Sequence, residues 1–317
     1  MAAQSGSRIV VYAALIGNFL IAVTKFVAAA FTGSSAMLSE GVHSLVDTGN
    51  ELLLLYGLSR AAVPPDREHP FGHGRELYFW SFVVAVLIFA LGAGVSTYEG
   101  FIHILEPEAV ENITVNYVVL ALSILFEGAS WAVALRAFNR ERGELGYIAA
   151  IRQSKDPTTF TVLVEDSVAL FGLLIALIGI FAADRLAMPE LDGAASIGIG
   201  LLLAATAFFL ARESKNLLIG EPALPKVQNA ILLAAQADED IRQVNGVSTA
   251  QLGPAVVIAM LSAEFEDHLT TPAIEACIER VETTVRRQYP EVISLFIKPQ
   301  TPATWRARIA EIRRVGG

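Results

Sequence analysis

The stretch SEGVHSLVDTGNELLLL, residues 39–55, places four polar side chains within an otherwise apolar segment. They are His43, Asp47, Asn50 and Glu51, and their offsets of four, seven and eight residues put all four along one face of a helix. A helix that faces lipid all round would carry leucine at such positions. The stretch therefore predicts a helix inside a bundle, with a polar face that serves some chemistry.

The composition is that of a membrane protein. Of the 317 residues, 54% are hydrophobic and only 17% are charged, whereas a soluble domain carries about 25% charged residues. Long apolar runs are confined to residues 1–212, so we expect a transmembrane domain over 1–212 and a cytoplasmic C-terminal domain over 213–317. The net charge of −9 argues against nucleic acid as a partner. The single cysteine, Cys277, excludes a disulfide framework.

Six segments are long and apolar enough to span a bilayer, which takes about 20 residues. They cover residues 9–31, 36–59, 79–103, 115–138, 160–183 and 191–211. The loops TGSS (32–35), LEPEAVEN (105–112) and ADRLAMPE (183–190) together contain one basic residue, Arg185, whereas the segments on the other side are rich in arginine and lysine. This bias predicts that both termini lie in the cytoplasm. Because no targeting segment points to an organelle, we expect a prokaryotic cytoplasmic (inner) membrane.

The C-terminal segment alternates between helical and strand patterns. Residues 225–238 and 272–289 have helical periodicity, and residues 244–253, 255–266 and 292–299 read as strands. The order α-β-β-α-β predicts a small sheet covered by helices, in a ferredoxin-like arrangement. The expected fold is thus an all-α six-helix transmembrane bundle followed by a small cytoplasmic α/β domain.

Ionisable side chains also occur inside other apolar spans. Glu127 lies in the fourth span, and Glu165 and Asp166 lie in the fifth. Each such group costs about 2.5–3.5 kcal/mol at the bilayer centre, so it usually faces a bundle interior or a water-filled route. A divalent metal would explain this expense, because zinc favours imidazole nitrogen and carboxylate oxygen in a tetrahedron. His43 and Asp47 supply two adjacent corners of that tetrahedron.

The remaining ligands must come from a second helix. Glu165 and Asp166 are neighbours, so their side chains diverge by about 100° and cannot both face one site squarely. We take Asp166 as a metal ligand and Glu165 as the second choice or a proton acceptor. Asn50, Glu51 and Glu127 are interpreted as proton-route or network residues, with simple helix packing as the alternative.

The loop DREHPFGHGRELYFW, residues 66–80, carries His69 and His73 around a compact turn. Pro70, Gly72 and Gly74 make a regular helix face improbable in this loop. Two interpretations stay open: a second metal site at His69 and His73, or a loop–helix junction that anchors the third span.

Together these features resemble the cation diffusion facilitator family. The resemblance rests on GSSAMLSEGVHSLVD at 33–47, DREHPFGHGRELYFW at 66–80, the six spans and the α-β-β-α-β domain. It implies a homodimer that exchanges cytoplasmic divalent metal for protons, with two transport ligands on the second helix and two on the fifth. On the second helix the ligand positions fall on His43 and Asp47. Histidine at the first position is associated in the family with zinc, and aspartate there with manganese, iron or cadmium.

The fifth helix departs from the family's common pattern. When it is aligned through Asp166, the usual histidine or aspartate four residues earlier falls on Val162, which cannot bind metal. The run DPTTFTVLVEDSVALFG, residues 156–172, resembles instead the subgroup that contains the ninth animal zinc transporter. Glu165, Asn50 or water remain as candidates for the fourth ligand.

The C-terminal domain also departs from many relatives. Its last strand, VISLFIKP, lacks the histidine and aspartate ligands that these relatives carry. The one histidine of the domain, His268, follows Glu266 and Asp267 and is interpreted as part of a surface turn. We therefore expect a dimerisation domain that is held together mainly by packing.

The function implied is proton-coupled export of zinc from the cytoplasm by alternating access. Zinc is then a transported substrate and H⁺ its counter-ion, because metal binding to histidine and carboxylates releases protons. An enzyme is not expected: the sequence contains neither His-Glu-x-x-His nor Gly-x-Ser-x-Gly. The open alternatives are an exporter selective for manganese, iron, cobalt or nickel, and a non-transporting membrane metal sensor or channel.

Overall fold

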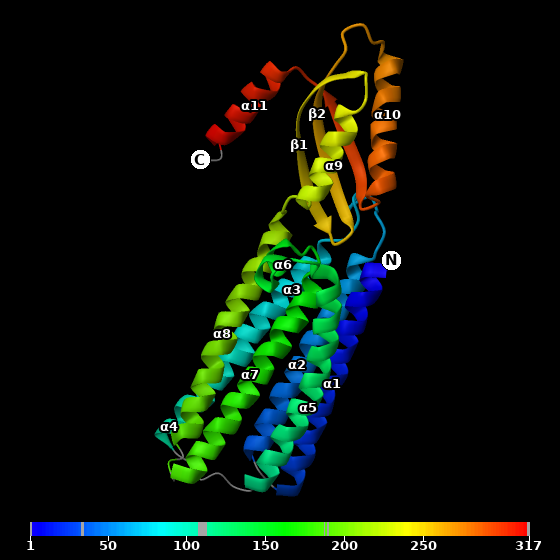
Figure 1. The fold of residues 1–317 in the computed structure, drawn as a ribbon. Helices are drawn as coiled ribbons and strands as arrows, with labels where there is room; N and C mark the ends of the chain where they lie inside the picture. The colour runs from blue at the N-terminus through cyan, green and yellow to red at the C-terminus, as the bar shows by residue number, and fades with distance from the viewer. Residues whose placement is uncertain (1, 33–34, 107–112, 187, 189, 316–317) are drawn as a thin grey trace. The chain divides into compact units, whose positions relative to one another are not determined.

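The fold is given by a computed structural model that describes residues 2–32, 35–106, 113–186, 188 and 190–315 (Figure 1). The predicted loops at 32–35, 105–112 and 183–190 lie partly outside these residues. The chain divides into two compact units. Residues 1–65 and 75–215 form the first, which we call the helical unit, and residues 66–74 and 216–317 form the second, which we call the sheet unit.

Six long helical segments make up the helical unit, and Figure 1 shows them running alongside one another. The third is continuous but changes its winding, because α3 (Glu76–Leu87) passes through the π-helical segment η1 (Ile88–Ala93) into α4 (Gly94–Leu105). The short helix α6 (Tyr147–Gln153), which the sequence patterns did not predict, precedes the fifth. The other five are α1 (Ala2–Thr32), α2 (Ser35–Ala61), α5 (Ile113–Arg142), α7 (Pro157–Leu186) and α8 (Glu190–Ile219).

Five of these segments are long and apolar enough to cross a membrane, within the described part of the chain. The exception is α2, whose 27 residues include Glu40, Asp47 and Glu51. This helix packs against α1 and α3, which are themselves apolar. The chain is therefore an integral membrane protein, and the predicted fold class is confirmed.

Close helix packing in the helical unit depends on glycine, and the crossing of α4 with α8 is an example. A Cβ atom added to Gly100 of α4 would lie 2.6 Å from the carbonyl oxygen of Gly193 in α8. A Cβ atom added to Gly193 would lie 2.7 Å from the carbonyl oxygen of Gly100. The two backbones approach each other so closely that neither position has room for a side chain.

The sheet unit follows the predicted order and adds one helix. It consists of α9 (Pro225–Gln236), β1 (Ile241–Gly253), β2 (Val256–Phe265), α10 (Thr271–Gln288), β3 (Val292–Pro299) and the unpredicted α11 (Pro302–Val315). The strand order is β1-β2-β3, with β1 antiparallel and β3 parallel to β2. Helices α9 and α10 pack beside the sheet (Figure 1) and bury the side chains of Ile231, Leu261 and Val281 in a common core.

The segment 66–74 packs against the end of the β1–β2 hairpin within this unit. A Cβ atom added to Gly74 would lie 2.5 Å from the carbonyl oxygen of Leu252, and one added to Gly253 would lie 2.9 Å from the Cα of Gly74. Only glycine permits this approach. The loop is therefore an integral part of the sheet unit even though it follows α2 in the sequence.

Candidate functional site

The four polar residues in the central stretch of helix α2 differ in their exposure to solvent. The Nε2 atom of His43 lies 4.0 Å from Oδ2 of Asp47, and the side chains are 27% and 32% exposed. One turn further along, Asn50 is 2% exposed and Glu51 is completely buried. The polar face therefore runs from a partly open end at His43 to a closed end at Glu51.

Asp166 of α7 is held by side chains of α5. The hydroxyl of Ser130 donates a 2.7 Å hydrogen bond to Oδ2 of Asp166, and the carboxyl group of Glu127 also hydrogen-bonds with Asp166. Beside them, the indole of Trp131 donates to the hydroxyl of Ser167 at 2.9 Å. Helix α5 thus orients the ligand that the sequence assigns to α7.

Glu165 is turned towards α2 and not away from it. Its carboxylate hydrogen-bonds with the side chain of Asn50, although one of its oxygens, Oε2, is buried without a partner among the described residues. Val162, one turn earlier on α7, is fully buried. Val162, which stands where the family usually has a ligand, is thus part of the apolar packing. The carboxylate of Glu165 and the amide of Asn50 meet nearby.

Five carboxyl groups from three helices lie within electrostatic range of one another. We call them the acid cluster: Asp47, Glu51, Glu127, Glu165 and Asp166. Lys25 of α1 acts on Glu127, but its ammonium group donates to Oε2 of Glu40 at 2.8 Å and to Ser44 at 3.0 Å. The acid cluster therefore carries more potential negative charge than Lys25 can balance, which is the electrostatic character of a cation site.

The predicted ligands are neighbours but do not form a closed coordination shell. Among the described residues, the sets of three or more ligand atoms within 4.8 Å of one another lie elsewhere, and His43, Asp47, Glu165 and Asp166 are not one of them. His43 reaches the π-helical segment η1, because a Cβ atom added to Gly92 would lie 4.0 Å from its Cε1. π-Helical turns often occur at functional sites, where they widen a helix locally.

The loop 66–74 forms the more compact set of ligand atoms. Oδ2 of Asp66 lies 3.1 Å from Nε2 of His73, and Oδ1 lies 3.5 Å from Nδ1 of His69. The backbone N–H of His69 donates to Oδ1 of Asp66 at 2.6 Å, and this bond, followed by the one to His73, lowers the pKa of Asp66 to about 2. Gly72 has a φ of 83°, which lets the chain turn back so that the two imidazole rings lie 4.1 Å apart.

Sequence reasoning found His69 and His73 in this loop but missed Asp66. The missing signal is the spacing Asp-x-x-His-x-x-x-His, which the compact turn converts into three convergent side chains. A carboxylate and two imidazoles are a donor set that suits zinc.

A second compact set, in the sheet unit, is already paired with an arginine. Asp238, Asp240 and Cys277 lie close together, but Arg280 bonds to Asp238 at 2.8 Å and to Asp240 at 2.7 Å. Burial, and then the hydrogen bond to Asp238, raise the pKa of the Cys277 thiol to about 12, so it is not a thiolate at neutral pH. His268 is exposed in a turn and lies in neither set.

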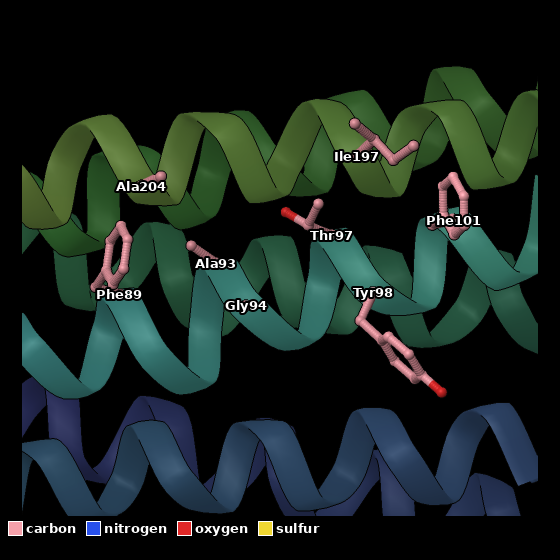
Figure 2. A pocket seen from close by; sticks show the side chains of 8 residues that line it. All are labelled: Phe89, Ala93, Gly94, Thr97, Tyr98, Phe101, Ile197 and Ala204. Carbon is pink, nitrogen blue, oxygen red and sulfur yellow. The ribbon is translucent and has the colours of Figure 1, made fainter.

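An apolar pocket in the helical unit lacks the chemistry of a metal site. Figure 2 shows it between the third helical segment and α8, with the Tyr98 hydroxyl directed away from α8. Its lining residues are mostly aliphatic or aromatic and offer no carboxylate or imidazole: Phe89, Ala93, Gly94, Thr97, Tyr98, Phe101, Ile197 and Ala204. The candidate sites that remain are the acid cluster and the side chains of Asp66, His69 and His73, which we call the loop set.

Comparisons with known proteins agree with this chemistry. A family model described as the cation efflux transmembrane domain matches residues 11–219. The chain is 34% identical over 84% of its length to the "Proton-coupled zinc antiporter SLC30A9, mitochondrial" of Xenopus laevis. It is 32% identical over 78% of its length to "Metal tolerance protein C4" of Arabidopsis thaliana, and 26% identical over 93% to "Magnetosome protein MamM" of Paramagnetospirillum magneticum.

The coverage of these relatives differs. The chain spans about half the length of the Xenopus and Arabidopsis proteins, 48% and 55%, and 88% of the bacterial protein.

Proposed function

Because the chain belongs to the cation diffusion facilitator (cation efflux) family, we propose that it exports zinc from the cytoplasm in exchange for protons. The observation that carries the proposal is the acid cluster, whose five carboxyl groups lie close together in an otherwise apolar helical bundle, with His43 beside Asp47. The printed name of the Xenopus relative, a proton-coupled zinc antiporter, supports zinc as the substrate and H⁺ as the counter-ion. The protein is then a transporter and not an enzyme.

The proposed zinc ligands come from two helices. His43 and Asp47 bind from α2 and Asp166 binds from α7, with Glu165 next to it as a further ligand or proton acceptor. Asn50 orients Glu165, and Glu127 orients Asp166, through the hydrogen bonds described above. One imidazole with several carboxylates also suits other divalent ions, so manganese, iron, cobalt and nickel are the competing substrates.

Proton coupling follows from the nature of these ligands. Zinc binds neutral imidazole and ionised carboxylate, so loading the site displaces protons and protonating the site displaces zinc. A site that opens alternately to two compartments therefore loads on the less acidic side and releases on the more acidic side. This cycle exchanges zinc for protons without any covalent step.

We further propose a prokaryotic cytoplasmic membrane with both termini in the cytoplasm, and a homodimer. The distribution of arginine and lysine supports the orientation. A paired apolar patch supports dimerisation through the sheet unit, because Met260 of β2 and Phe296 of β3 are partners in the sheet and remain 50% and 53% exposed. In this proposal residues 1–212 are the transmembrane domain and residues 213–317 the cytoplasmic domain.

A second, structural or regulatory metal site is proposed at the loop 66–74. The three ligand atoms of Asp66, His69 and His73 lie within 4.8 Å of one another, which suits a small divalent cation. Water or another group would complete the shell.

Flux through reconstituted protein tests the proposed function. The full chain is placed in liposomes that contain a zinc-sensitive dye, and a pH gradient is imposed across the membrane. We expect zinc flux that follows the pH gradient, and its loss in His43→Ala and in Asp47→Ala. Size-exclusion chromatography shows whether the variants remain folded.

Ser123→Ala is the matched control, since Ser123 is a buried residue of α5 that has no hydrogen-bond partner in the described structure. It should transport at the wild-type rate. Zinc flux that persists in folded His43→Ala or Asp47→Ala protein would contradict the ligand assignment. Zinc flux that does not depend on the pH gradient would contradict the exchange of zinc for protons. Competition by manganese, iron, cobalt and nickel ranks the substrates.

A further inference from the structure

The α7 position at which the family resemblance places a ligand holds Val162, whose side chain is apolar and fully buried. We propose that Glu51 of α2, one helical turn after Asp47, supplies the metal ligand that Val162 cannot. The inference rests on the proposed function and names a further residue of the same site.

The state of the Glu51 carboxyl group is the first argument. The side chain is completely buried, and neither carboxylate oxygen has a hydrogen-bond partner among the described residues. Burying a carboxyl group without hydrogen-bond partners lowers the folding stability by several kcal/mol. A cation beside the carboxyl group offsets this cost. The other buried acids differ in this respect, because Asp166 accepts from Ser130 and Glu165 bonds with Asn50.

The position of Glu51 on its helix is the second argument. His43, Asp47 and Glu51 follow one another at intervals of four residues, so their side chains form a row on one face of α2. A cation that contacts Asp47 is therefore within reach of Glu51 on the same row. The helix can supply three ligands, where the family resemblance assigns two.

The surroundings of Glu51 are the third argument. The charges that act on it most strongly are those of Glu165 and then Asp166, both from α7, followed by Glu127 and Asp47. The Glu51 carboxylate thus lies within electrostatic range of two acids of α7, the helix that carries Val162. A divalent cation between α2 and α7 would replace repulsion among these acids by coordination.

The resulting donor set has three carboxylates, those of Asp47, Glu51 and Asp166, whereas His43 lies next to Asp47 and two helical turns, about 12 Å along the axis, from Glu51. Glu127 hydrogen-bonds with Asp166 and Asn50 with Glu165, so these two residues position ligands. An oxygen-rich set of this kind binds harder ions such as manganese more readily than a set with two imidazoles does. Glu51 is then a determinant of metal selectivity as well as a ligand.

Zinc binding to full-length protein tests this inference. All proteins in this experiment carry His69→Ala and His73→Ala. These substitutions remove the histidines of the loop set, so that the zinc binding that is measured comes from the intramembrane site. Isothermal titration gives the zinc dissociation constant in detergent, and zinc X-ray absorption gives the number and type of ligand atoms. Glu51→Gln keeps the shape of the side chain and removes its charge, whereas Glu127→Gln removes the same charge from a residue assigned to positioning.

We expect Glu51→Gln to weaken zinc binding by about 100-fold or more and to change the set of oxygen atoms around the zinc. Glu127→Gln should weaken zinc binding by about 10-fold and leave that set unchanged, as expected for a residue that bonds to a ligand and not to the metal. Glu51→Asp, which shortens the side chain but keeps the carboxylate, should recover part of the affinity. Thermal melting without zinc checks that each variant is folded.

Each outcome bears on the inference in a defined way. If Asp47→Ala abolishes binding but Glu51→Gln binds zinc as the parent does, Glu51 is not a ligand and the proposed function stands. If Glu51→Gln and Glu127→Gln lose affinity equally and with the same shell, the effect is one of charge alone and the inference is overturned. If the parent protein neither binds nor transports zinc, the proposed function itself fails.

Discussion

At the scale of single residues, few hydrogen bonds hold the acid cluster together. Ser130 bonds to Asp166 and Asn50 to Glu165, while Glu51 has no partner in the described part of the chain. Unpaired buried groups cost stability and persist where function requires them. The few bonds that do exist should therefore matter for metal affinity.

We predict that Ser130→Ala weakens zinc binding about 10-fold, since it removes the hydrogen bond that orients Asp166. Ser123→Ala, a change of the same kind on the same helix, should leave the zinc dissociation constant unaltered because its hydroxyl has no partner among the described residues. Isothermal titration measures both constants. Equal affinities for the two variants would show that Ser130 does not position the ligand.

At the scale of secondary structure elements, the third helical segment combines a change in winding with close packing. Its π-helical part, Ile88–Ala93, lies beside His43 at Gly92. Further along, Gly100 meets Gly193 of α8 with no space for side chains. The segment is thus widened near the polar face of α2 and fixed tightly against α8 at its far end.

Gly193→Ala is expected to destabilise the protein by about 1–3 kcal/mol, because a Cβ atom at this position collides with the Gly100 backbone. Gly128→Ala on α5 provides the comparison. Gly128→Ala raises the helix propensity as much as Gly193→Ala does, but a Cβ atom at residue 128 would meet nothing within 4 Å. Thermal denaturation in detergent should give a lower midpoint for Gly193→Ala alone. Equal midpoints would refute the close contact between α4 and α8.

At the scale of the whole molecule, the chain passes between the two units three times. It leaves the helical unit after Pro65, returns at Arg75 and leaves again after Lys215. The first excursion carries Asp66, His69 and His73, and its last residue, Gly74, packs against the β1–β2 hairpin. Metal bound by this loop would therefore stabilise the sheet unit.

Zinc at about 100 times its dissociation constant should stabilise the loop and the β1–β2 hairpin by about 2.7 kcal/mol, which slows their hydrogen exchange about 100-fold. Asp66→Asn should abolish this protection. The pKa of Asp66 is lowered to about 2, so its carboxylate is already ionised well below pH 5 and protonates only in stronger acid. Protonation of Asp66 therefore cannot account for a loss of the zinc effect between pH 7 and pH 5. Hydrogen-exchange mass spectrometry at both pH values measures it, and protection that survives in Asp66→Asn would exclude the loop site.

Much of the fold was predictable because it follows from local pattern. The apolar runs gave the membrane helices, and the alternation in residues 244–266 gave β1 and β2. The π-helical turn at Ile88–Ala93 was not predictable, because its sequence, IFALGA, carries no local signal for the wider winding. Helix α11 was missed although its residues can form an amphipathic helix.

The proximity of candidate side chains was predictable where they share one helix and less so where they meet through the fold. That His43 lies next to Asp47 follows from their spacing on α2 alone. The burial of Glu51 and its proximity to the charge of Glu165 depend on how the helices of the bundle pack, which the sequence does not state. Asp66 was missed because a turn made by Gly72, and not a helix, brings it to His69 and His73.

The contact between Gly74 and the end of β1 affects how the protein can be divided for experiments. A fragment that begins at residue 216 contains every strand of the sheet but omits residues 66–74. Such a fragment would expose to solvent the backbone of Leu252 and Gly253, which Gly74 covers in the intact chain. A soluble version of this unit is complete only if the nine-residue segment is supplied as well, for instance through a designed linker or as a separate peptide.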